Sequence, residues 1–343
     1  MAPLDDVLNL IRTSLPGLAA SIDRNNSVPG EFLDELARAG AFRALSLGLR
    51  GVYQAVREAS KWSPAVAHII MTSASVAFRV GSDGEIFALC ITEPGGGTDI
   101  RANLKTRAED RAGGEAYIAG EKVFASNSLY ASSFLVLANG SAGPTLYMVK
   151  RGPGVRVEPQ DLFTFRGAGV GRVVFENAPA TVVGTPGRGI REALETVNFE
   201  RLSYGFIGLG IKDGALEEAG PRALRKVIFG KELGEYQGIR WALADIEVAS
   251  RLLEEFLNAA VARAESAGRV DPYDAAIAKV SGAQLAQRAT WLAIQIMGGS
   301  GFASGSRLER LARDARMLDI GAGAREVVYD FIGEMAVKKY RGP

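Results

Sequence analysis

The chain has 343 residues, 47% of them hydrophobic and 23% charged, with 40 Lys and Arg against 39 Asp and Glu. This length is enough for two or three domains, and a net charge of +1 gives no electrostatic basis for binding nucleic acid or an acidic membrane. A single cysteine, Cys90, and a single histidine, His68, exclude a disulfide framework and argue against a His/Cys metal site or a Cys–His nucleophile. Carboxylates or a cofactor must therefore supply any chemistry.

Neither a membrane span nor a targeting segment is expected. The longest apolar run, 65–80, is interrupted by Ser73, Ser75 and Arg79, which makes it too short and too polar to cross a bilayer. The first residues, MAPLDDVLNLIRTSLPGL, carry acidic side chains early and lack a compact apolar segment followed by a cleavage site. We therefore expect a cytoplasmic protein.

Residues 1–85 have helical periodicity. Residues 86–182 change to short segments rich in β-branched and aromatic residues and separated by glycine turns, which predicts a small antiparallel barrel or sandwich. Expected helices in the first region are 32–42, 52–62 and 66–78, and expected strands in the second are 86–92, 115–126, 133–139, 145–151 and 172–178.

Residues 183–343 return to long helical patterns joined by short connections, which predicts an antiparallel bundle. The expected helices are 187–219, 235–268, 271–299, 307–318 and 325–340. The predicted fold class is therefore a multidomain α+β protein, with a helical domain over 1–85, a β domain over 86–182 and a helical bundle over 183–343.

The segment CITEPGGGTDI, residues 90–100, ends a strand and opens a glycine-rich loop. Glycines let a backbone approach a ligand closely, and the N–H groups of such a loop can bind phosphate oxygens. Composition alone favours a simple glycine-rich turn between two strands.

This segment resembles the TEPG signature of the acyl-CoA dehydrogenase family of flavoproteins. Five later segments resemble further motifs of that family and follow in its order: GEAYIAGEKVFASNS, VVFENAPA, FGKELGEYQ, QIMGGSGF and RDARMLDIGAGARE. The resemblance implies a helical domain, an antiparallel β-barrel and a C-terminal four-helix bundle. Periodicity gives the same order independently.

The resemblance also implies FAD as the cofactor, and no metal. Residues implied for the flavin and phosphate side are Leu89, Ile91, Thr92, Gly97, Thr98, Phe124 and Ser126. In this family a neighbouring subunit holds the adenine half, and the residues implied there are Lys226, Phe229, Gln237, Gln295, Gly298 and Gly299. Lys226 stands where the family often has Arg. In the last motif, Ala324 replaces a hydroxyl residue and Glu326 is retained.

The catalytic base is expected at Glu200. Most of the family carry a glutamate in the last motif, where this chain has Ala322 within IGAG. Enzymes that resemble isovaleryl-CoA dehydrogenase carry IGAG there and take their glutamate from the long helix after the barrel, directly before an arginine. Here VNFERLSYG supplies Glu200 and Arg201, and we expect Glu200 to lie against an apolar wall that raises its pKa. A solvated Glu–Arg pair on a helix face is the alternative.

The implied reaction is the α,β-dehydrogenation of an acyl-CoA thioester, with the Ala322 N–H binding the thioester oxygen. An electron-transfer flavoprotein is the implied acceptor, and a homotetramer or homodimer the implied assembly. A flavin-dependent oxidase or monooxygenase, or a non-catalytic relative, remains an alternative. The N-terminal domain is shortened relative to the family between Gly51 and Ser63, which favours an oxidase, whereas Glu200 argues against it.

Overall fold

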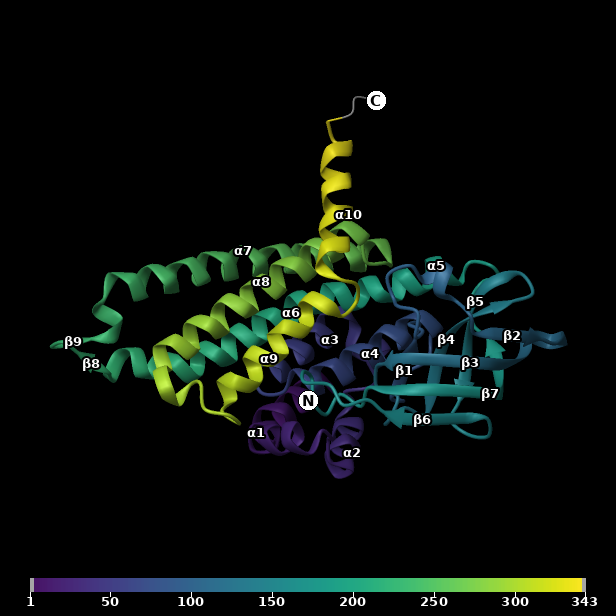
Figure 1. Ribbon diagram of the computed structural model, residues 1–343, viewed down its shortest axis with the longest axis horizontal. Coiled ribbons are helices and arrows are strands. Elements are labelled where there is room, and N and C mark those ends of the chain that lie inside the picture. The colour runs from purple at the N-terminus through teal and green to yellow at the C-terminus, as the bar shows by residue number, and fades with distance from the viewer. Residues whose placement is uncertain (1–2, 341–343) are drawn as a thin grey trace.

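The computed structural model describes residues 3–340 and has three regions, visible as helices, strands and a helical bundle (Figure 1). The first region is four helices: α1 (Pro3–Asn25), α2 (Gly30–Ala39), α3 (Ala44–Ser60) and α4 (Pro64–Val80). Residues 61–63 alone connect α3 to α4. Helix α4 is capped by the Ser63 hydroxyl, which accepts from the Val66 N–H, and is buried from Pro64 to Ala77.

The middle region is a seven-stranded sheet in which five strands close into a ring, in the order β4-β2-β3-β7-β5 and back to β4. Strand β1 extends the ring beside β4, and β6 pairs with β7. The ring is mostly antiparallel, but β4 pairs in parallel with both β1 and β2. The strands are β1 (Phe87–Cys90), β2 (Arg107–Asp110), β3 (Glu115–Ala125), β4 (Ser133–Gly140), β5 (Gly143–Lys150), β6 (Val155–Pro159) and β7 (Gly171–Val182).

Two of these strands, β2 and β6, were not expected from the sequence. Both are short and half exposed, so neither carries a continuous apolar signal. A four-residue helix, α5 (Ile100–Asn103), lies in the connection between β1 and β2, directly after the glycine-rich loop.

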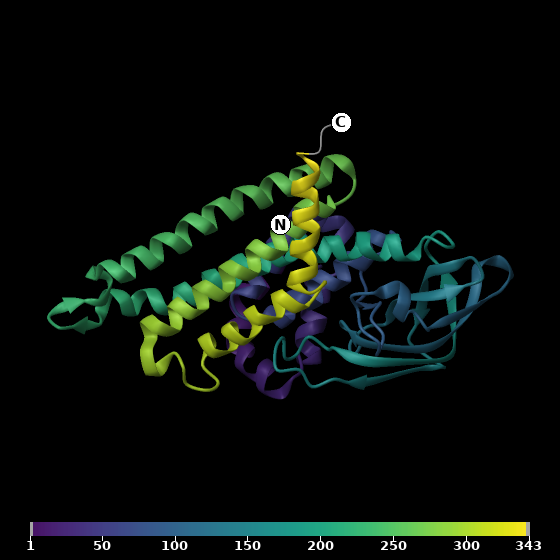
Figure 2. The same cartoon turned by 45° about the horizontal axis from the view of Figure 1, so that its top comes forward.

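Four long helices form the C-terminal bundle, and a fifth helix leaves it at a steep angle (Figures 1 and 2). They are α6 (Gly189–Arg225), α7 (Gln237–Ala267), α8 (Pro272–Met297), α9 (Arg307–Ile320) and the departing α10 (Arg325–Lys338). A small hairpin of β8 (Val227–Ile228) and β9 (Lys231–Glu232) joins α6 to α7 at the end far from the barrel. The predicted fold class is confirmed.

Helix α6 is the central element because other helices approach its backbone closely. A side chain at Gly208 would collide with the backbone of Gly282 on α8, and one at Gly210 would collide with the carbonyl oxygen of Arg57 on α3. Glycine at these positions therefore fixes α6 between the N-terminal helices and the bundle. No helix within residues 3–340 combines the length and apolar character needed to cross a bilayer.

Candidate active site

Glu200 lies on the buried stretch of α6 and is only 5% exposed. Its Oε1 accepts hydrogen bonds from the Thr72 hydroxyl at 3.1 Å and the Ser75 hydroxyl at 3.4 Å, both on α4. Burial raises the pKa of Glu200 to about 7, although the two hydroxyls oppose this shift. A carboxyl group with such a pKa can exchange a proton near neutral pH.

Arg201 contacts the turn between α9 and α10. Its Nε donates to the Ala322 carbonyl oxygen at 2.8 Å, and Nη1 donates to Oδ1 of Asn198 at 3.2 Å. Burial lowers the pKa of Arg201. Glu200 and Arg201 are adjacent on the helix, so their side chains reach different elements, and Glu200 makes no hydrogen bond to the turn within residues 3–340.

The two glycines of this turn, Gly321 and Gly323, leave room for two side chains from α6. A side chain at Gly321 would collide with the Tyr204 hydroxyl, and one at Gly323 would have its Cβ 3.0 Å from Nη2 of Arg201. Ala322 has a φ of 54°, which non-glycine residues seldom adopt. Its N–H donates to no acceptor within residues 3–340, so it is free to bind another group. Tyr204 lies one helical turn after Glu200 on α6, and its hydroxyl reaches this turn.

The residues expected around the flavin ring lie at one end of the barrel. Leu89 is bridged to Ser126 across the sheet, and the Val123 N–H donates to the Thr92 carbonyl oxygen at 2.9 Å. Phe124 is 56% exposed with a φ of 52°, held by its N–H bond to Oε1 of Gln160 at 2.6 Å. Thus β1 and the end of β3 bring these residues together.

The loop that follows β1 is exposed where ligand binding was expected. Gly97 and Thr98 are both exposed, and Ile91 and Thr92 are half-buried beside them. The Cβ of a side chain at Gly97 would lie 3.0 Å from Oγ1 of Thr92, so the loop lies flat over the strand end. An open, glycine-rich backbone beside an exposed aromatic ring is compatible with a flavin ring and its phosphates.

His68 on α4 contacts Ser126, one of the residues expected around the flavin ring. Its Nε2 lies 2.9 Å from Oγ of Ser126, while Nδ1 is buried without a partner within residues 3–340. Burial lowers the pKa of His68 to about 4, so the ring is neutral at physiological pH. No sequence motif links His68 with Ser126, which lies 58 residues further along the chain.

The six residues expected at the adenine half lie at the opposite end of the molecule, around the β8–β9 hairpin and the end of α8 (Figure 1). All six are exposed: Lys226, Phe229, Gln237, Gln295, Gly298 and Gly299. One chain therefore does not bring them to its own barrel. Ala324 is half-buried as the residue preceding α10, and Glu326 is exposed in its first turn.

A buried ion pair underlies the glycine-rich loop. Nζ of Lys122 lies 2.8 Å from Oε1 of Glu93, with side chains 0% and 5% exposed. Glu93 also accepts from the N–H groups of Lys105 and Thr106. Burial alone would raise the pKa of Glu93, but Lys122 and these donors outweigh it and lower the pKa. The glutamate of the TEPG motif is therefore a structural anchor for the loop.

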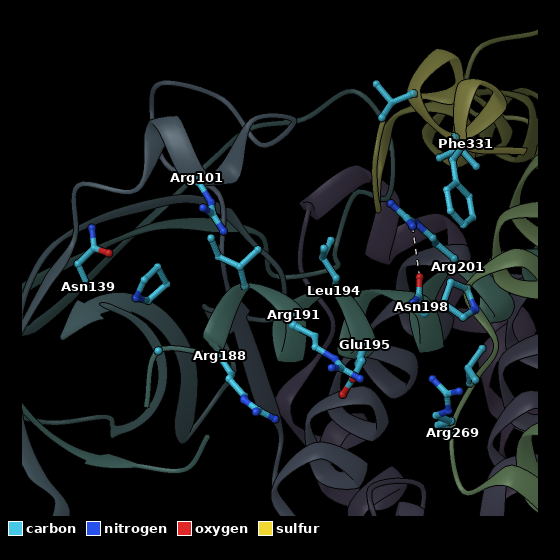
Figure 3. Close-up of a pocket in the computed structure, with 17 residues that line it drawn as sticks. Arg101, Asn139, Arg188, Arg191, Leu194, Glu195, Asn198, Arg201, Arg269 and Phe331 are labelled. Carbon is cyan, nitrogen blue, oxygen red and sulfur yellow. Dashed lines mark hydrogen bonds and ion pairs between the residues drawn. The ribbon is translucent and has the colours of Figure 1, made fainter. Parts of the chain in front are cut away.

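An open cavity of about 1080 Å³ lies between the barrel, the start of α6 and α10 (Figure 3). It is lined by a strong excess of positive charge, with Glu195 the acidic residue among the lining side chains. A cavity of this kind favours a large anionic ligand. Arg188, Arg191 and Arg201 lie at or near the start of α6, whereas Arg101 comes from α5 and Arg269 from the α7–α8 connection. Sequence patterns did not group the five because the last two are far from α6 in the chain.

Comparison with known proteins gives two matches to one family. Residues 88–178 match the profile described as acyl-CoA dehydrogenase, middle domain, and residues 187–337 match acyl-CoA dehydrogenase, C-terminal domain. Together the matches cover well over half of the chain. The solved butyryl-CoA dehydrogenase of Megasphaera elsdenii is similar at 25% identity with a TM-score of 0.89, covering 98% of each chain.

Two curated relatives are similar over about three quarters of this chain. Isovaleryl-CoA dehydrogenase of Oryza sativa subsp. japonica is 31% identical over 75% of this chain and 65% of its own length. Acryloyl-CoA reductase (NADH) of Anaerotignum propionicum is 29% identical over 76% of this chain and 68% of its own length. The chain thus aligns with about two thirds of each relative.

The closed barrel, the bundle and both profile matches define an acyl-CoA dehydrogenase architecture. The chain belongs to the acyl-CoA dehydrogenase family, whose members are FAD-dependent oxidoreductases that act on CH–CH bonds. The resemblance seen in the sequence motifs is therefore confirmed.

Proposed function

We propose that this protein dehydrogenates an acyl-CoA thioester between Cα and Cβ to give the 2,3-enoyl-CoA, with Glu200 as the base that removes the α-proton. The observation that carries the proposal is a buried carboxyl group whose pKa is raised to about 7. It lies one helical turn before Tyr204, whose hydroxyl reaches the α9–α10 turn, where the Ala322 N–H has no acceptor within residues 3–340. Bound FAD supplies the hydride acceptor.

The chain's own residues divide the remaining work. Glu200 takes the α-proton, and the Ala322 N–H donates to the thioester oxygen, which stabilises the charge that develops there. Arg201 positions Ala322 by holding its carbonyl oxygen. The ring and phosphates of FAD would be held by residues of β1, the loop after it and the end of β3: Leu89, Ile91, Thr92, Gly97, Thr98, Phe124 and Ser126.

The separation of the two groups of expected FAD residues supports sharing of FAD between subunits. The β8–β9 hairpin and helices α7 and α8 also carry exposed aromatic and aliphatic residues, and large exposed apolar surfaces mark sites of association. They include Phe229 at 95%, Trp291 at 73%, Leu252 at 69% and Trp241 at 65% exposed. We infer a homodimer or homotetramer in which each barrel faces a partner's hairpin. An electron-transfer flavoprotein is the proposed electron acceptor.

A short or branched acyl group is the proposed substrate. Aromatic rings fill the interface of α3, α4 and α6 next to Glu200, which limits the room for a long chain there. Tyr53 stacks on Phe206 with ring centroids 4.8 Å apart and on Phe199 at 5.2 Å, and Phe78 lies 5.4 Å from Phe199.

The direct test is anaerobic addition of butyryl-CoA or isovaleryl-CoA to the purified FAD-loaded protein. The proposal expects the flavin absorbance to bleach and an enoyl-CoA to form, faster than with palmitoyl-CoA. Rapid, repeated turnover with oxygen as the acceptor, giving one hydrogen peroxide per enoyl-CoA, would support an oxidase instead. An unchanged flavin spectrum with all three thioesters would reject the dehydrogenase.

The arginine-lined cavity is proposed to bind the phosphates of CoA, which predicts a selective effect of removing its charges. Arg188 and Arg269 are exposed in the cavity and form no ion pair within residues 3–340. Because each exposed charge contact contributes at most about 1 kcal/mol, roughly fivefold, the variant Arg188→Gln with Arg269→Gln should raise KM for butyryl-CoA several-fold, up to about thirtyfold.

The same variant should leave KM for butyryl-pantetheine, which lacks the phosphates, unchanged. Steady-state kinetics with both thioesters measures the difference. Arg38→Gln, an exposed arginine on α2 outside the cavity, is the matched control and should change neither value. Equal rises of KM for the two thioesters would contradict phosphate binding in this cavity.

A further inference from the structure

Helix α4 carries an unusual polar face. It is buried from Pro64 to Ala77 and largely apolar, yet His68, Thr72 and Ser75 lie within two turns on one side. Burying a polar group is costly unless it is hydrogen-bonded. Nε2 of His68 meets this requirement at Ser126, and the hydroxyls of Thr72 and Ser75 meet it at Glu200. One helix therefore contacts both the flavin end of the barrel and the carboxylate.

The two hydroxyls are not equivalent. The Thr72 hydroxyl has Oε1 of Glu200, at 3.1 Å, as its hydrogen-bond acceptor within residues 3–340. The Ser75 hydroxyl lies 2.9 Å from the Thr72 carbonyl oxygen and 3.4 Å from Oε1, so its single proton is shared. Both contacts are on the same carboxylate oxygen. Oε2 makes no hydrogen bond within residues 3–340.

We propose that Thr72, assisted by Ser75, is a positioning residue that holds Oε1 of Glu200 and thereby leaves Oε2 as the atom that accepts the proton. This inference rests on the proposed role of Glu200 as the base. A carboxylate anchored through one oxygen keeps its side chain in one rotamer, so Oε2 is presented in one place. Such positioning matters because a small misplacement of a reacting group costs on the order of 10²-fold in rate.

The same contacts set when Glu200 is ionised. Both hydroxyls stabilise the carboxylate and so lower its pKa against the larger opposing effect of burial. No cation offsets burial, because Glu200 forms no ion pair within residues 3–340. Three titratable groups around this part of α6 are kept neutral by burial: Tyr53, His68 and Tyr204. The charged groups there have other partners: Arg79, Arg201, Lys279 and Asp319.

The test is a direct titration of Glu200 by infrared spectroscopy in the FAD-loaded protein. The band of the protonated carboxyl group is identified by its loss in Glu200→Gln. In Thr72→Val, which keeps the shape but loses the donor, the midpoint should rise by about one to two pH units. Ser75→Ala should give a smaller rise, and Thr72→Ser should restore the wild-type midpoint.

Ser73→Ala is the matched control on α4, because the Ser73 hydroxyl accepts from Asn127 and the Phe87 N–H and makes no contact with Glu200. It should leave the titration unchanged. The rising limb of kcat/KM against pH should move upward by the same amount as the infrared midpoint. Wild-type titration in both Thr72→Val and Ser75→Ala would overturn the inference, as would failure of Thr72→Ser to restore it.

Failure of the proposed function has a different signature. If no acyl-CoA reduces the flavin of the wild-type protein, Glu200 is not the base of such a reaction, whatever its infrared titration shows. A shifted infrared midpoint together with an unshifted pH–rate profile would overturn the proposed link between anchoring and proton transfer.

Discussion

Glu200→Gln is expected to bind FAD normally while the rate of flavin reduction by butyryl-CoA falls by at least about 10²–10⁴-fold. Glutamine keeps the shape of the side chain and can still accept from Thr72 at its amide oxygen, but it cannot take the α-proton. Rapid mixing under anaerobic conditions measures the rate, and the flavin absorbance of the purified variant measures cofactor content.

Glu217→Gln is the matched control, because Glu217 lies on the same helix with a 46% exposed side chain paired with Lys61. It should reduce its flavin at the wild-type rate. Wild-type flavin reduction in Glu200→Gln would exclude Glu200 as the base. Loss of FAD from Glu200→Gln would show instead that this residue maintains the cofactor site.

Lys122→Met is expected to give the largest loss of stability, about 3–5 kcal/mol in the free energy of unfolding. The substitution leaves the Glu93 carboxylate buried without its cation, beneath the loop expected to hold FAD. Urea denaturation of the FAD-loaded protein measures the free energy of unfolding, and the fraction of bound flavin should fall with it.

The control is Lys150→Met, which removes the cation of an exposed pair. Side chains of Lys150 and Glu85 are 67% and 34% exposed, so this change should cost no more than about 1 kcal/mol. Similar losses for the two variants would show that the Lys122–Glu93 pair contributes no more than a surface pair. Adding Glu93→Gln to Lys122→Met should recover part of the loss, because it removes the unpaired charge.

The order of helices, barrel and bundle could be predicted because the hydrophobic period changes from helical to strand-like near residue 86 and back to helical near residue 183. The parallel pairing of β1 and β2 with β4 could not, since strand direction depends on contacts between segments far apart in the chain. Period alone also missed β2 and β6, which are short and half exposed.

A candidate site residue could be predicted where a motif includes it, and it was missed where only tertiary packing brings it to the site; the role of Glu200 stays a prediction. Glu200 precedes an arginine in a recognisable motif. Thr72 and Ser75 belong to an apolar helix, in which nothing in the sequence distinguishes a functional hydroxyl from a structural one. Lys122 could not be distinguished from an exposed strand residue, because nothing in the sequence indicates that its charge is buried against Glu93. The motifs associate the turn at Ala322 with Glu200, but the side chains that approach this turn are those of Tyr204 and Arg201. The assignments of individual FAD contacts, the subunit arrangement and the compartment stay predictions.

The most direct test of the central claim is anaerobic reduction of the wild-type flavin by butyryl-CoA carrying deuterium at Cα, compared with the unlabelled thioester from pH 6 to 8. If Glu200 removes the α-proton, the flavin bleaches, deuterium slows it, and the rate constant at low substrate rises with pH around a midpoint near 7, where Glu200 ionises. The account would be contradicted if short acyl-CoA thioesters did not bleach the flavin. It would also be contradicted if the rate constant of bleaching changed neither with deuterium at Cα nor with pH.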